Sequence, residues 1–432
     1  MTMLLSVLLG TILLQTVVVR CEVEFEFLTI DWVWPNTSMR DEYIARGDYD
    51  PKLCHLSAIQ VDDFNSQTKV FVTAPRLKEA KGVPSGLNTV EHLSPDSKTG
   101  ILRPFPDWET NKLGDCNALQ LPMSIAIDPR TGYLYVIDVG RVGVTSDHPS
   151  NLCPPKLVVF NTRAGGLLVR SHEFPDSVVS RSTNFLNDIV LDYVDLDHPT
   201  GVRYAYISDT KAEQIVVFDF STNETWSFND ISMSADEDSN ITINGVLYQW
   251  PFGINGIAIS PSFNYVYYSA LGSKKLWQIP TWVLRNKNAN FLDHVRTVGS
   301  KVDNSDAMVF GKQGLYYGAL SKNAVYVWDA VKDAVSQGVS EGELKLQTER
   351  QLIQNSETIQ WPDGIALSGA TNNQGVGSLY FVSARAQLFH AGTLDISGAQ
   401  GINFRIFKIP VNDVSALSEQ PSDTTYPPVI VG

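Results

Sequence analysis

The stretch Asn255-Gly256-Ile257-Ala258-Ile259 decides the fold, because related stretches recur along the chain. Each copy has a first residue that is polar in five of the six cases, then a small residue, then an apolar run. The other copies begin, at intervals of 51 to 68 residues, at Ser57, Met123, Asn187, Asp306 and Asp363. After a turn, each copy is followed by a second apolar run, such as Val266-Tyr267-Tyr268-Ser269. A repeat of this period built only of strands is typical of a radial array of small sheets.

The six repeats predict an all-β fold: a six-bladed β-propeller with four-stranded blades around a central channel, in a single domain. The early stretch Val23–Phe27 alternates apolar and charged residues and precedes the first blade. We expect it to complete the last blade as its outer strand, because that closure pairs an otherwise exposed sheet edge. Residues 281–288 are expected to form a short helix or a loop. Residues 384–403 are expected to form a plain inter-strand connection rather than a cover over one channel mouth.

The two ends of the chain fall outside the repeats. Residues 1–20 carry the apolar run Leu4–Val19 with Arg20 at its end, which is typical of a secretory signal peptide and too short for a spanning helix. The propeller is expected over residues 21–417, and residues 418–432, rich in Ser, Pro and Thr, are expected to be a mobile tail. The sequence therefore predicts a secreted, extracellular protein.

The charge balance limits the classes of partner. Lys and Arg number 33 against 47 Asp and Glu, a formal net charge of −14. No basic stripe for nucleic acid or for an anionic membrane is present, so we expect neither as a partner. A small cationic ligand would be attracted to such a chain. The sequence leaves the oligomeric state open.

Cysteines and glycosylation sequons fit an oxidising compartment. Cys116 and Cys153 flank the first two strands of the second blade and are the expected disulfide pair. Cys54 either pairs with Cys21 or is a buried thiol at the start of the first blade. Three sequons predict glycosylation sites at Asn36, Asn223 and Asn240.

The repeats also predict where a ligand would bind. In a propeller the first strand of each blade lines the channel, so the first residues of the six copies are expected on a ring at one mouth. Five of these are polar: Ser57, Asn187, Asn255, Asp306 and Asp363. Aromatic residues that precede ring residues would form walls, namely Phe185, Phe252 and Trp361. Carboxylates beside aromatic faces suit an amine that carries an aromatic ring.

Two other readings of the ring stay open. Asp and Asn at strand starts also satisfy backbone N–H groups and make tight turns, which is a purely structural role. The ring oxygens are the type of ligand that Ca²⁺ prefers, but two carboxylates form a lean shell, so no metal and no cofactor is expected. The seven histidines are scattered, and a surface or packed role is favoured for His55, two residues before Ser57.

Several further phrases resemble the insect yellow and major royal jelly protein family. They include Arg103-Pro-Phe-Pro-Asp-Trp, Cys153-Pro-Pro-Lys-Leu, Gln360-Trp-Pro-Asp-Gly and Asn403-Phe-Arg-Ile-Phe-Lys-Ile-Pro. The resemblance covers about Phe27 to Val411. The chain is similar to a yellow-type member of this family, because its tail is short. It implies a secreted six-bladed propeller, a Cys116–Cys153 disulfide, and roles in melanin pigmentation, dopachrome conversion or amine binding. The chain departs from the pattern at Ala384, where many relatives carry Asn.

These observations lead to one hypothesis and two alternatives. The chain would act in the melanin and catecholamine pathway, converting an oxidised catechol such as dopachrome by tautomerisation. Asp306 or Asp363 would be the base, and Asn187 or Asn255 would stabilise the oxyanion. Alternatively, the channel binds aromatic amines or catechol-derived ligands without catalysis, with Trp361 among the stacking groups. The third possibility is a structural or developmental role in cuticle.

Overall fold

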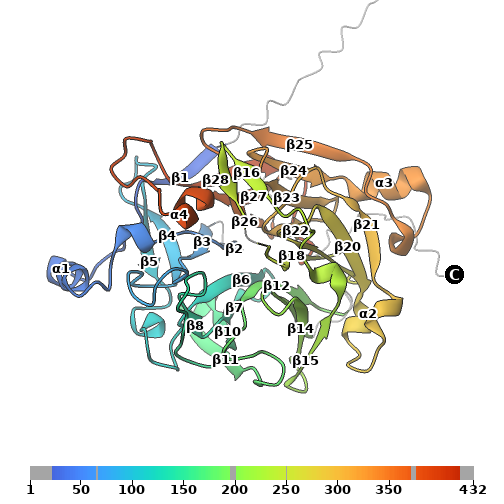
Figure 1. Ribbon diagram of the computed structural model, residues 1–432, viewed down its shortest axis with the longest axis horizontal. Coiled ribbons are helices and arrows are strands. Elements are labelled where there is room, and N and C mark those ends of the chain that lie inside the picture. Colours follow the sequence, from blue (N-terminus) through green and yellow to red (C-terminus); the bar gives the residue numbers. More distant parts are fainter. Residues whose placement is uncertain (1–21, 65–66, 195–200, 250, 371–375, 419–432) are drawn as a thin grey trace, which may run out of the picture.

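The computed structural model describes residues 22–64, 67–194, 201–249, 251–370 and 376–418. Six four-stranded antiparallel sheets stand around a central channel, so the predicted six-bladed β-propeller is confirmed (Figure 1). The predicted signal peptide, Cys21 and residues 419–432 of the predicted tail lie outside the described residues. Within the described residues no helix is long and apolar enough to cross a membrane.

Each blade runs from an innermost to an outermost strand. The first blade consists of β2 (Ile59–Phe64), β3 (Gln67–Thr73), β4 (Leu87–His92) and β5 (Gly100–Pro104). The second consists of β6 (Pro122–Asp128), β7 (Tyr133–Asp138), β10 (Lys156–Asn161) and β11 (Leu167–Glu173). The third consists of β12 (Leu186–Asp192), β13 (Tyr204–Asp209), β14 (Gln214–Asp219) and β15 (Glu224–Asn229). The fourth and fifth are β18 (Ile254–Ile259), β19 (Tyr265–Ala270), β20 (Lys275–Pro280) and β21 (Arg296–Ser300); and β22 (Met308–Phe310), β23 (Leu315–Ala319), β24 (Ala324–Trp328) and β25 (Glu349–Gln354).

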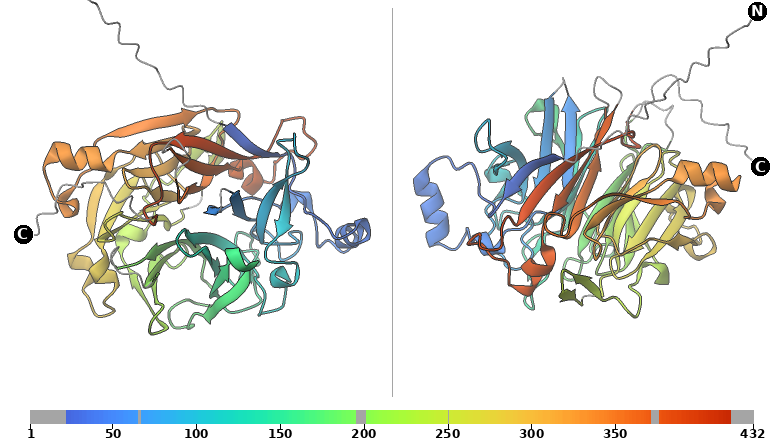
Figure 2. Two further views of the ribbon diagram at one scale, coloured as in Figure 1. Left: turned by 180° about the vertical axis from the view of Figure 1, so that it is seen from behind. Right: turned by 90° about the horizontal axis from the view of Figure 1, so that it is seen from above.

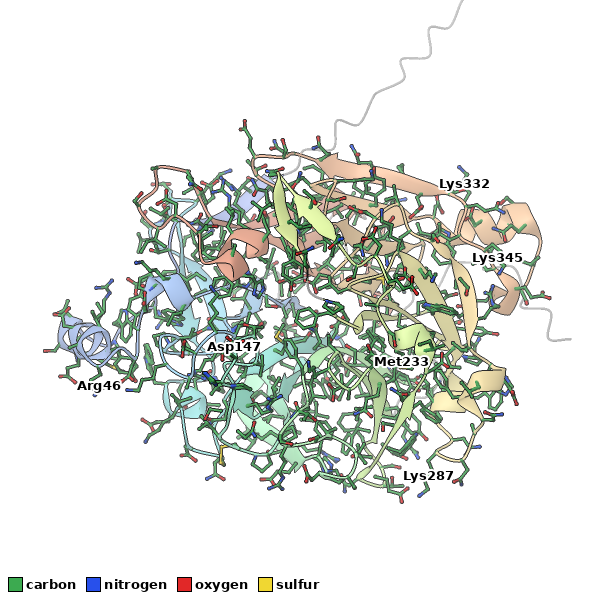
Figure 3. All side chains as sticks on the ribbon, in the orientation of Figure 1. Arg46, Asp147, Met233, Lys287, Lys332 and Lys345 are labelled. Atoms are coloured by element: carbon green, nitrogen blue, oxygen red, sulfur yellow. A yellow bond between two sulfur atoms is a disulfide. The ribbon has the colours of Figure 1, made fainter. Side chains whose placement is uncertain are left out.

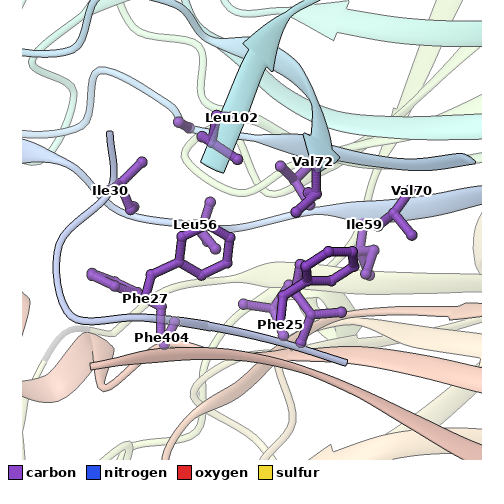
Figure 4. Packing of buried hydrophobic residues seen from close by; sticks show 14 of the residues in the cluster. Phe25, Phe27, Ile30, Leu56, Ile59, Val70, Val72, Leu102 and Phe404 are labelled. Carbon is purple, nitrogen blue, oxygen red and sulfur yellow. The ribbon is translucent and has the colours of Figure 1, made fainter. Parts of the chain in front are cut away.

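The sixth blade joins the two ends of the chain. It consists of β26 (Pro362–Leu367), β27 (Gly377–Ser383), β28 (Phe404–Val411) and, as its outer strand, β1 (Glu22–Phe27). The predicted closure is confirmed, because β1 pairs antiparallel with β28 and Phe27 lies opposite Phe404. Figure 4 shows the consequence: Phe25 and Phe27 pack between β28 and the first blade.

Helices and short hairpins decorate this ring. The helices are α1 (Thr37–Ala45), α2 (Thr281–Leu284), α3 (Ala330–Gln337) and α4 (Ala386–Ala391), and the hairpins are β8 (Arg141–Val142) with β9 (Ser150–Asn151) and β16 (Ile241–Ile243) with β17 (Val246–Tyr248). The hairpin β16–β17 and helix α4 lie on the same face of the propeller (Figure 2). The long connection after β27 is therefore more than a plain loop, because part of it forms α4.

Side chains fill the space between the blades, and charged groups such as Arg46 and Lys287 lie at the periphery (Figure 3). The Cys116–Cys153 disulfide is confirmed, with the two Cα atoms 5.3 Å apart. Cys54 is a buried free thiol whose sulfur donates to the carbonyl oxygens of Asp50 and Gly82. The predicted sequon residues are all exposed: Asn36, Asn223 and Asn240.

Candidate functional site

The repeated stretches meet the channel through β-bulges. In four blades the pairing of the two innermost strands shifts register at the repeat: between Pro122 and Ser124, Leu186 and Ile189, Ile254 and Ile257, and Pro362 and Ile365. A bulge leaves a residue unpaired and re-aims its side chain, and bulges are common beside functional sites. The interrupted ladder therefore frees the ring residues Met123, Asn187, Asn255 and Asp363 to line the channel.

Two glycines of the repeat are required by the close approach of neighbouring blades. A Cβ on Gly256 would lie 2.3 Å from the carbonyl oxygen of Asp306, and one on Gly364 would lie 2.4 Å from the carbonyl oxygen of Ser57. Contacts this short with backbone atoms are sterically forbidden. These glycines thus let adjacent blades come together at the channel, and they bring Asn255 close to Asp306 and Asp363 close to Ser57.

A cavity at the upper mouth, where the innermost strands begin, gathers every ligand or catalytic residue that the sequence singled out. These eight residues are Ser57, Phe185, Asn187, Phe252, Asn255, Asp306, Trp361 and Asp363. Five of them begin repeated stretches, and the other three, Phe185, Phe252 and Trp361, precede such a residue by two or three positions. The structure adds His55, Tyr248 and His390 to the same cavity.

Aromatic side chains form two sides of the upper cavity. The rings of Phe185 and Phe252 meet edge to face with centroids 5.9 Å apart. Those of Tyr248 and Trp361 also meet edge to face, at 4.8 Å. Tyr248 comes from the hairpin β16–β17, which no repeat predicted. Such faces provide a large apolar surface with a negative π cloud, which suits a flat or cationic ligand.

Two carboxyl groups lie at the base of the aromatic walls. The indole nitrogen of Trp361 donates to Asp306 Oδ2 at 2.8 Å, and the Asn255 side chain also hydrogen-bonds to Asp306. Burial raises the pKa of Asp306 above its ordinary value, and these two donors oppose the rise. Burial, and then the charge of Asp306, raise the pKa of Asp363 well above its ordinary value. Of the two groups, Asp306 is therefore the one whose ionised form is favoured by donors, and Asp363 is the one whose ionisation is opposed by its neighbour.

A third carboxyl group, Asp188, lies below the pair. It accepts hydrogen bonds from Ser124 Oγ at 3.0 Å and from the backbone N–H groups of Ile189 and Ile257. Burial nevertheless raises the pKa of Asp188 to about 7. In the sequence Asp188 occupies the small-residue position of its repeat, which does not indicate that its side chain faces the channel. The bulge in β12, which the structure shows, accounts for this orientation.

Two imidazoles face the upper cavity. His55 is 2% exposed, and neither ring nitrogen has a partner among the described residues. Burial, then the charges of His390 and Lys78, lower the pKa of His55 well below its ordinary value. Burial lowers the pKa of His390 to about 4. Both rings are thus neutral at physiological pH. Of the surface and packed positions expected for His55, the structure shows the packed one, and the unpaired ring nitrogens lie beside the cavity.

The backbone that holds this wall is strained. Trp361 and Arg385 adopt positive φ angles of 49° and 45°, which residues other than glycine rarely do. The backbone N–H of Arg385 donates to the carbonyl oxygen of Gln360 at 3.2 Å, and that of Ala384 donates to the same oxygen at 3.1 Å. Such strain persists only where surrounding contacts fix it, and it concentrates at functional sites. The start of α4 is thereby fixed to the residue before Trp361.

Below the carboxyl groups the channel is aliphatic. A lower cavity of about 80 Å³ shares Ser57, Asp306 and Asp363 with the upper one and is otherwise lined mostly by Ile, Leu, Val and Ala side chains of the innermost strands. Residues 415–417 line its far end, where the backbone N–H of Ala416 donates to the carbonyl oxygen of Phe310. Most polar side chains of the channel therefore lie at the upper mouth, whereas the carboxyl group of Asp188 lines the lower cavity. Among the described residues, no group of three or more His, Cys, Asp or Glu side chains is arranged to hold a metal ion.

The sequence of the chain is similar to those of several known proteins. Residues 122–419 match the family described as "Major royal jelly protein". The chain belongs to this family. Within the major royal jelly protein family, Major royal jelly protein 1 of Apis mellifera is 26% identical over 400 residues, which cover 90% of this chain and 87% of that protein. The resemblance that the sequence phrases indicated is therefore confirmed.

Two other relatives carry names that concern chemistry or colour. "Dopaminechrome tautomerase" of Drosophila melanogaster is 25% identical over 424 residues, which cover 94% of this chain and 85% of that protein. "Protein yellow" of Drosophila melanogaster is 28% identical over 279 residues, covering 62% of this chain and 49% of that protein. The match therefore spans about half the length of Protein yellow. Among solved structures, a luciferin-regenerating enzyme aligns over 86% of this chain and 99% of its own, with a TM-score of 0.46 and 10% identity.

Proposed function

We propose that the upper cavity is the active site of a tautomerase that acts on aminochromes, the cyclised quinones formed by oxidation of catecholamines. The observation that carries this proposal is the carboxyl pair Asp306 and Asp363 at the base of an aromatic cavity, with pKa values raised by burial. The relative named for dopaminechrome tautomerisation, which aligns with 94% of this chain, supports the same substrate class.

The proposed reaction is a proton transfer that needs no oxidant. Asp306, held ionised by Trp361 and Asn255, takes a proton from a saturated ring carbon of the aminochrome. The electron pair of that C–H bond moves into the ring, and a quinone oxygen takes a proton from the Asp363 carboxyl group. This first transfer gives a quinone methide with one hydroxyl group and leaves Asp306 protonated and Asp363 ionised. In a second transfer the ionised Asp363 takes a proton from the adjacent saturated carbon and Asp306 returns its proton to the other quinone oxygen, so the pair again holds one proton and the product is an aromatic dihydroxyindole isomeric with the substrate.

The other cavity residues would bind and orient the substrate. The flat ring stacks between the Phe185–Phe252 and Tyr248–Trp361 walls. An unpaired nitrogen of His55 would form a hydrogen bond with the second quinone oxygen of the substrate, the one that Asp363 does not protonate. A neutral imidazole suits this role, because it offers one donor and one acceptor without a charge.

The test is dopaminechrome decay with purified protein and its Asp306→Asn and Asp363→Asn variants. Both variants are expected to lose at least about a hundredfold in kcat/KM, the usual contribution of a positioned acid or base. Asp63→Asn is the matched control, since Asp63 is another carboxyl whose pKa is raised by burial, at the far end of β2 and outside both cavities. Wild-type protein that folds but leaves the decay rate unchanged refutes the proposal.

A second candidate function is non-catalytic binding of aromatic amines such as dopamine or serotonin. The observation in its favour is the ionised Asp306 carboxylate beside the Trp361 ring, which together suit an ammonium group on an aromatic ligand. Calorimetry distinguishes the two: saturable heat with dopamine, lost in Asp306→Asn, without any acceleration of dopaminechrome decay, selects the binder. Both proposals include a role in pigmentation and secretion into the extracellular space. N-terminal sequencing of the protein exported from expressing cells tests the secretion.

A further inference from the structure

A second cavity, separate from the channel, lies behind helix α4. It has a volume of about 430 Å³ and is formed by the turn of the β16–β17 hairpin, the connection between β25 and β26, the start of α4 and the start of β28. Its lining is polar and includes two guanidinium groups, those of Arg385 and Arg405. None of the residues of the aminochrome cavity contributes to it.

Arg385 is a buried cation that forms no ion pair with a carboxylate among the described residues. Its side chain is 8% exposed. Its Nη1 donates to the carbonyl oxygen of Gln400 at 3.0 Å and to Asn403 Oδ1 at 3.3 Å, whereas its Nε is buried with no partner among the described residues. Both acceptors are neutral, so they satisfy hydrogen-bond donors without compensating the charge. An uncompensated buried charge is costly, and a native structure keeps one where a ligand supplies the opposite charge.

Arg405 adds to this positive charge. It is 9% exposed, and its Nε donates to Glu26 Oε1 at 3.1 Å while its Nη1 donates to the carbonyl oxygen of Ile402. Glu26 thus balances Arg405 alone. Burial first, and then the charge of Arg405, lower the pKa of Arg385, while the charge of Asp395 opposes them to a smaller extent. Asp395 neither lines the cavity nor forms an ion pair with Arg385 among the described residues, so it compensates the guanidinium charge only at longer range.

Among the described residues that line the cavity, Glu357 is the only one with a carboxylate, and it is exposed. Thr358 and Gln360 are among the remaining lining residues. A guanidinium with an unused N–H group, a second guanidinium nearby and neutral donors around them form the environment that recognises an oxyanion.

We infer that this cavity binds a small ligand through an oxyanion group, a carboxylate, phosphate or sulfate, held by Arg385 with Arg405 beside it. The volume admits a small organic anion as well as the inorganic ion. The site does not depend on the channel chemistry, because the two cavities share no residue. Its nearest link to the channel is Gln360, which accepts the backbone N–H of Arg385 and directly precedes Trp361.

The experiment is isothermal titration calorimetry of the full-length secreted protein with sodium phosphate, sodium sulfate and sodium acetate, each against sodium chloride at equal ionic strength. We expect saturable binding of at least one oxyanion at one site per chain. Tighter binding of phosphate or sulfate identifies a tetrahedral group, and tighter binding of acetate identifies a carboxylate. Heats that do not exceed those of chloride for all three ions overturn the inference.

Two variants locate the site. Arg385→Gln should weaken binding by about tenfold or more, because it removes a charge-assisted hydrogen bond. Glu357→Gln should tighten binding by up to about fivefold, since it removes a nearby exposed negative charge. Arg181→Gln is the control, an exposed arginine 3.8 Å from Glu173 and remote from the cavity. If Arg385→Gln does not fold, the exposed Glu357→Gln variant still decides: unchanged or weaker binding places the anion elsewhere.

Discussion

Replacing Trp361 by phenylalanine tests whether Asp306 acts as an ionised carboxylate. Phenylalanine keeps an aromatic ring against Tyr248 but removes the indole N–H that donates to Asp306 Oδ2 at 2.8 Å. A hydrogen bond to a charged group contributes about 1.5–3 kcal/mol. Since one pKa unit corresponds to about 1.4 kcal/mol, the pKa of Asp306 should rise by about one to two units.

The direction of the effect follows from the opposing contributions at Asp306. Burial raises its pKa and the Trp361 hydrogen bond lowers it, so the variant leaves burial less opposed. A carboxylate base is active only above its pKa. The acidic limb of kcat/KM for dopaminechrome conversion should therefore move to higher pH by about one to two units, while activity on the alkaline side of that limb is largely retained.

Trp328→Phe is the matched control for this variant. Trp328 is fully buried in β24, its indole nitrogen donates to Asp333 Oδ2 at 2.8 Å, and it lines neither channel cavity. It should lose a similar amount of stability and keep the wild-type pH profile. A folded Trp361→Phe protein whose acidic limb coincides with that of wild type would contradict the reasoning, and so would an equal displacement in Trp328→Phe.

Three further predictions concern stability and binding. Because burial raises the pKa of Asp188 to about 7, the folded chain keeps a proton that the unfolded chain releases near pH 4. This group therefore lowers the free energy of unfolding by up to about 4 kcal/mol as the pH rises from about 4 to 7. Urea unfolding of wild type and Asp188→Asn at about pH 5 and pH 8 should show that the variant lacks this loss of stability. An equal pH dependence of the two proteins would contradict the prediction. His55→Phe should keep stability within about 0.5 kcal/mol, since its nitrogens have no partner among the described residues, yet lower kcat/KM for dopaminechrome about tenfold to a hundredfold; thermal melts and initial rates check both. Replacing Cys116 and Cys153 together by Ala opens a covalent loop with a sequence separation of 37 and should cost about 4 kcal/mol of unfolding free energy in urea; a loss under about 1 kcal/mol would contradict the loop-entropy estimate.

The architecture was predictable from the sequence because a propeller repeats one local pattern. In each copy an apolar run follows a first residue, polar in five of the six cases, and a small residue. This pattern is local in the sequence, so it can be recognised without knowing which residues pack against the strand. The closing strand was predictable for a related reason, since β1 alternates and has no other blade to join. The disulfide followed from two cysteines that flank one pair of strands.

The site was predictable only where it is built from the repeat. Asn255 and Asp363 are the second residues of innermost strands and Ser57 lies two residues before one, so their places follow from the repeat. Tyr248 and His390 come from connections, whose course is set by tertiary packing rather than by a repeating pattern. They pack on Trp361 from the hairpin and from α4, two segments 142 residues apart in the chain.

Other site residues were obscured by local rules that gave a simpler answer. Asp188 occupies a position where Gly, Ala or Ser would serve, and only the register shift in β12 turns it toward the channel. His55 lies before its strand, where periodicity makes no statement about side-chain direction. Its role emerges from burial without hydrogen-bond partners, which is a property of the assembled fold. Bulges and unpaired polar atoms therefore mark the part of the site that sequence patterns could not supply.

The pairing of β1 with β28 also has a consequence for biosynthesis. The ion pair between Glu26 and Arg405 joins residues 379 positions apart. At about 5–20 residues per second, ribosomes need roughly 20 to 75 s to proceed from one to the other. Throughout that time the first strand carries Phe25 and Phe27, which are 5% and 1% exposed in the finished protein, without the β28 side of the surface that will cover them. The nascent chain is thus a natural client for chaperones until its last blade has been translated.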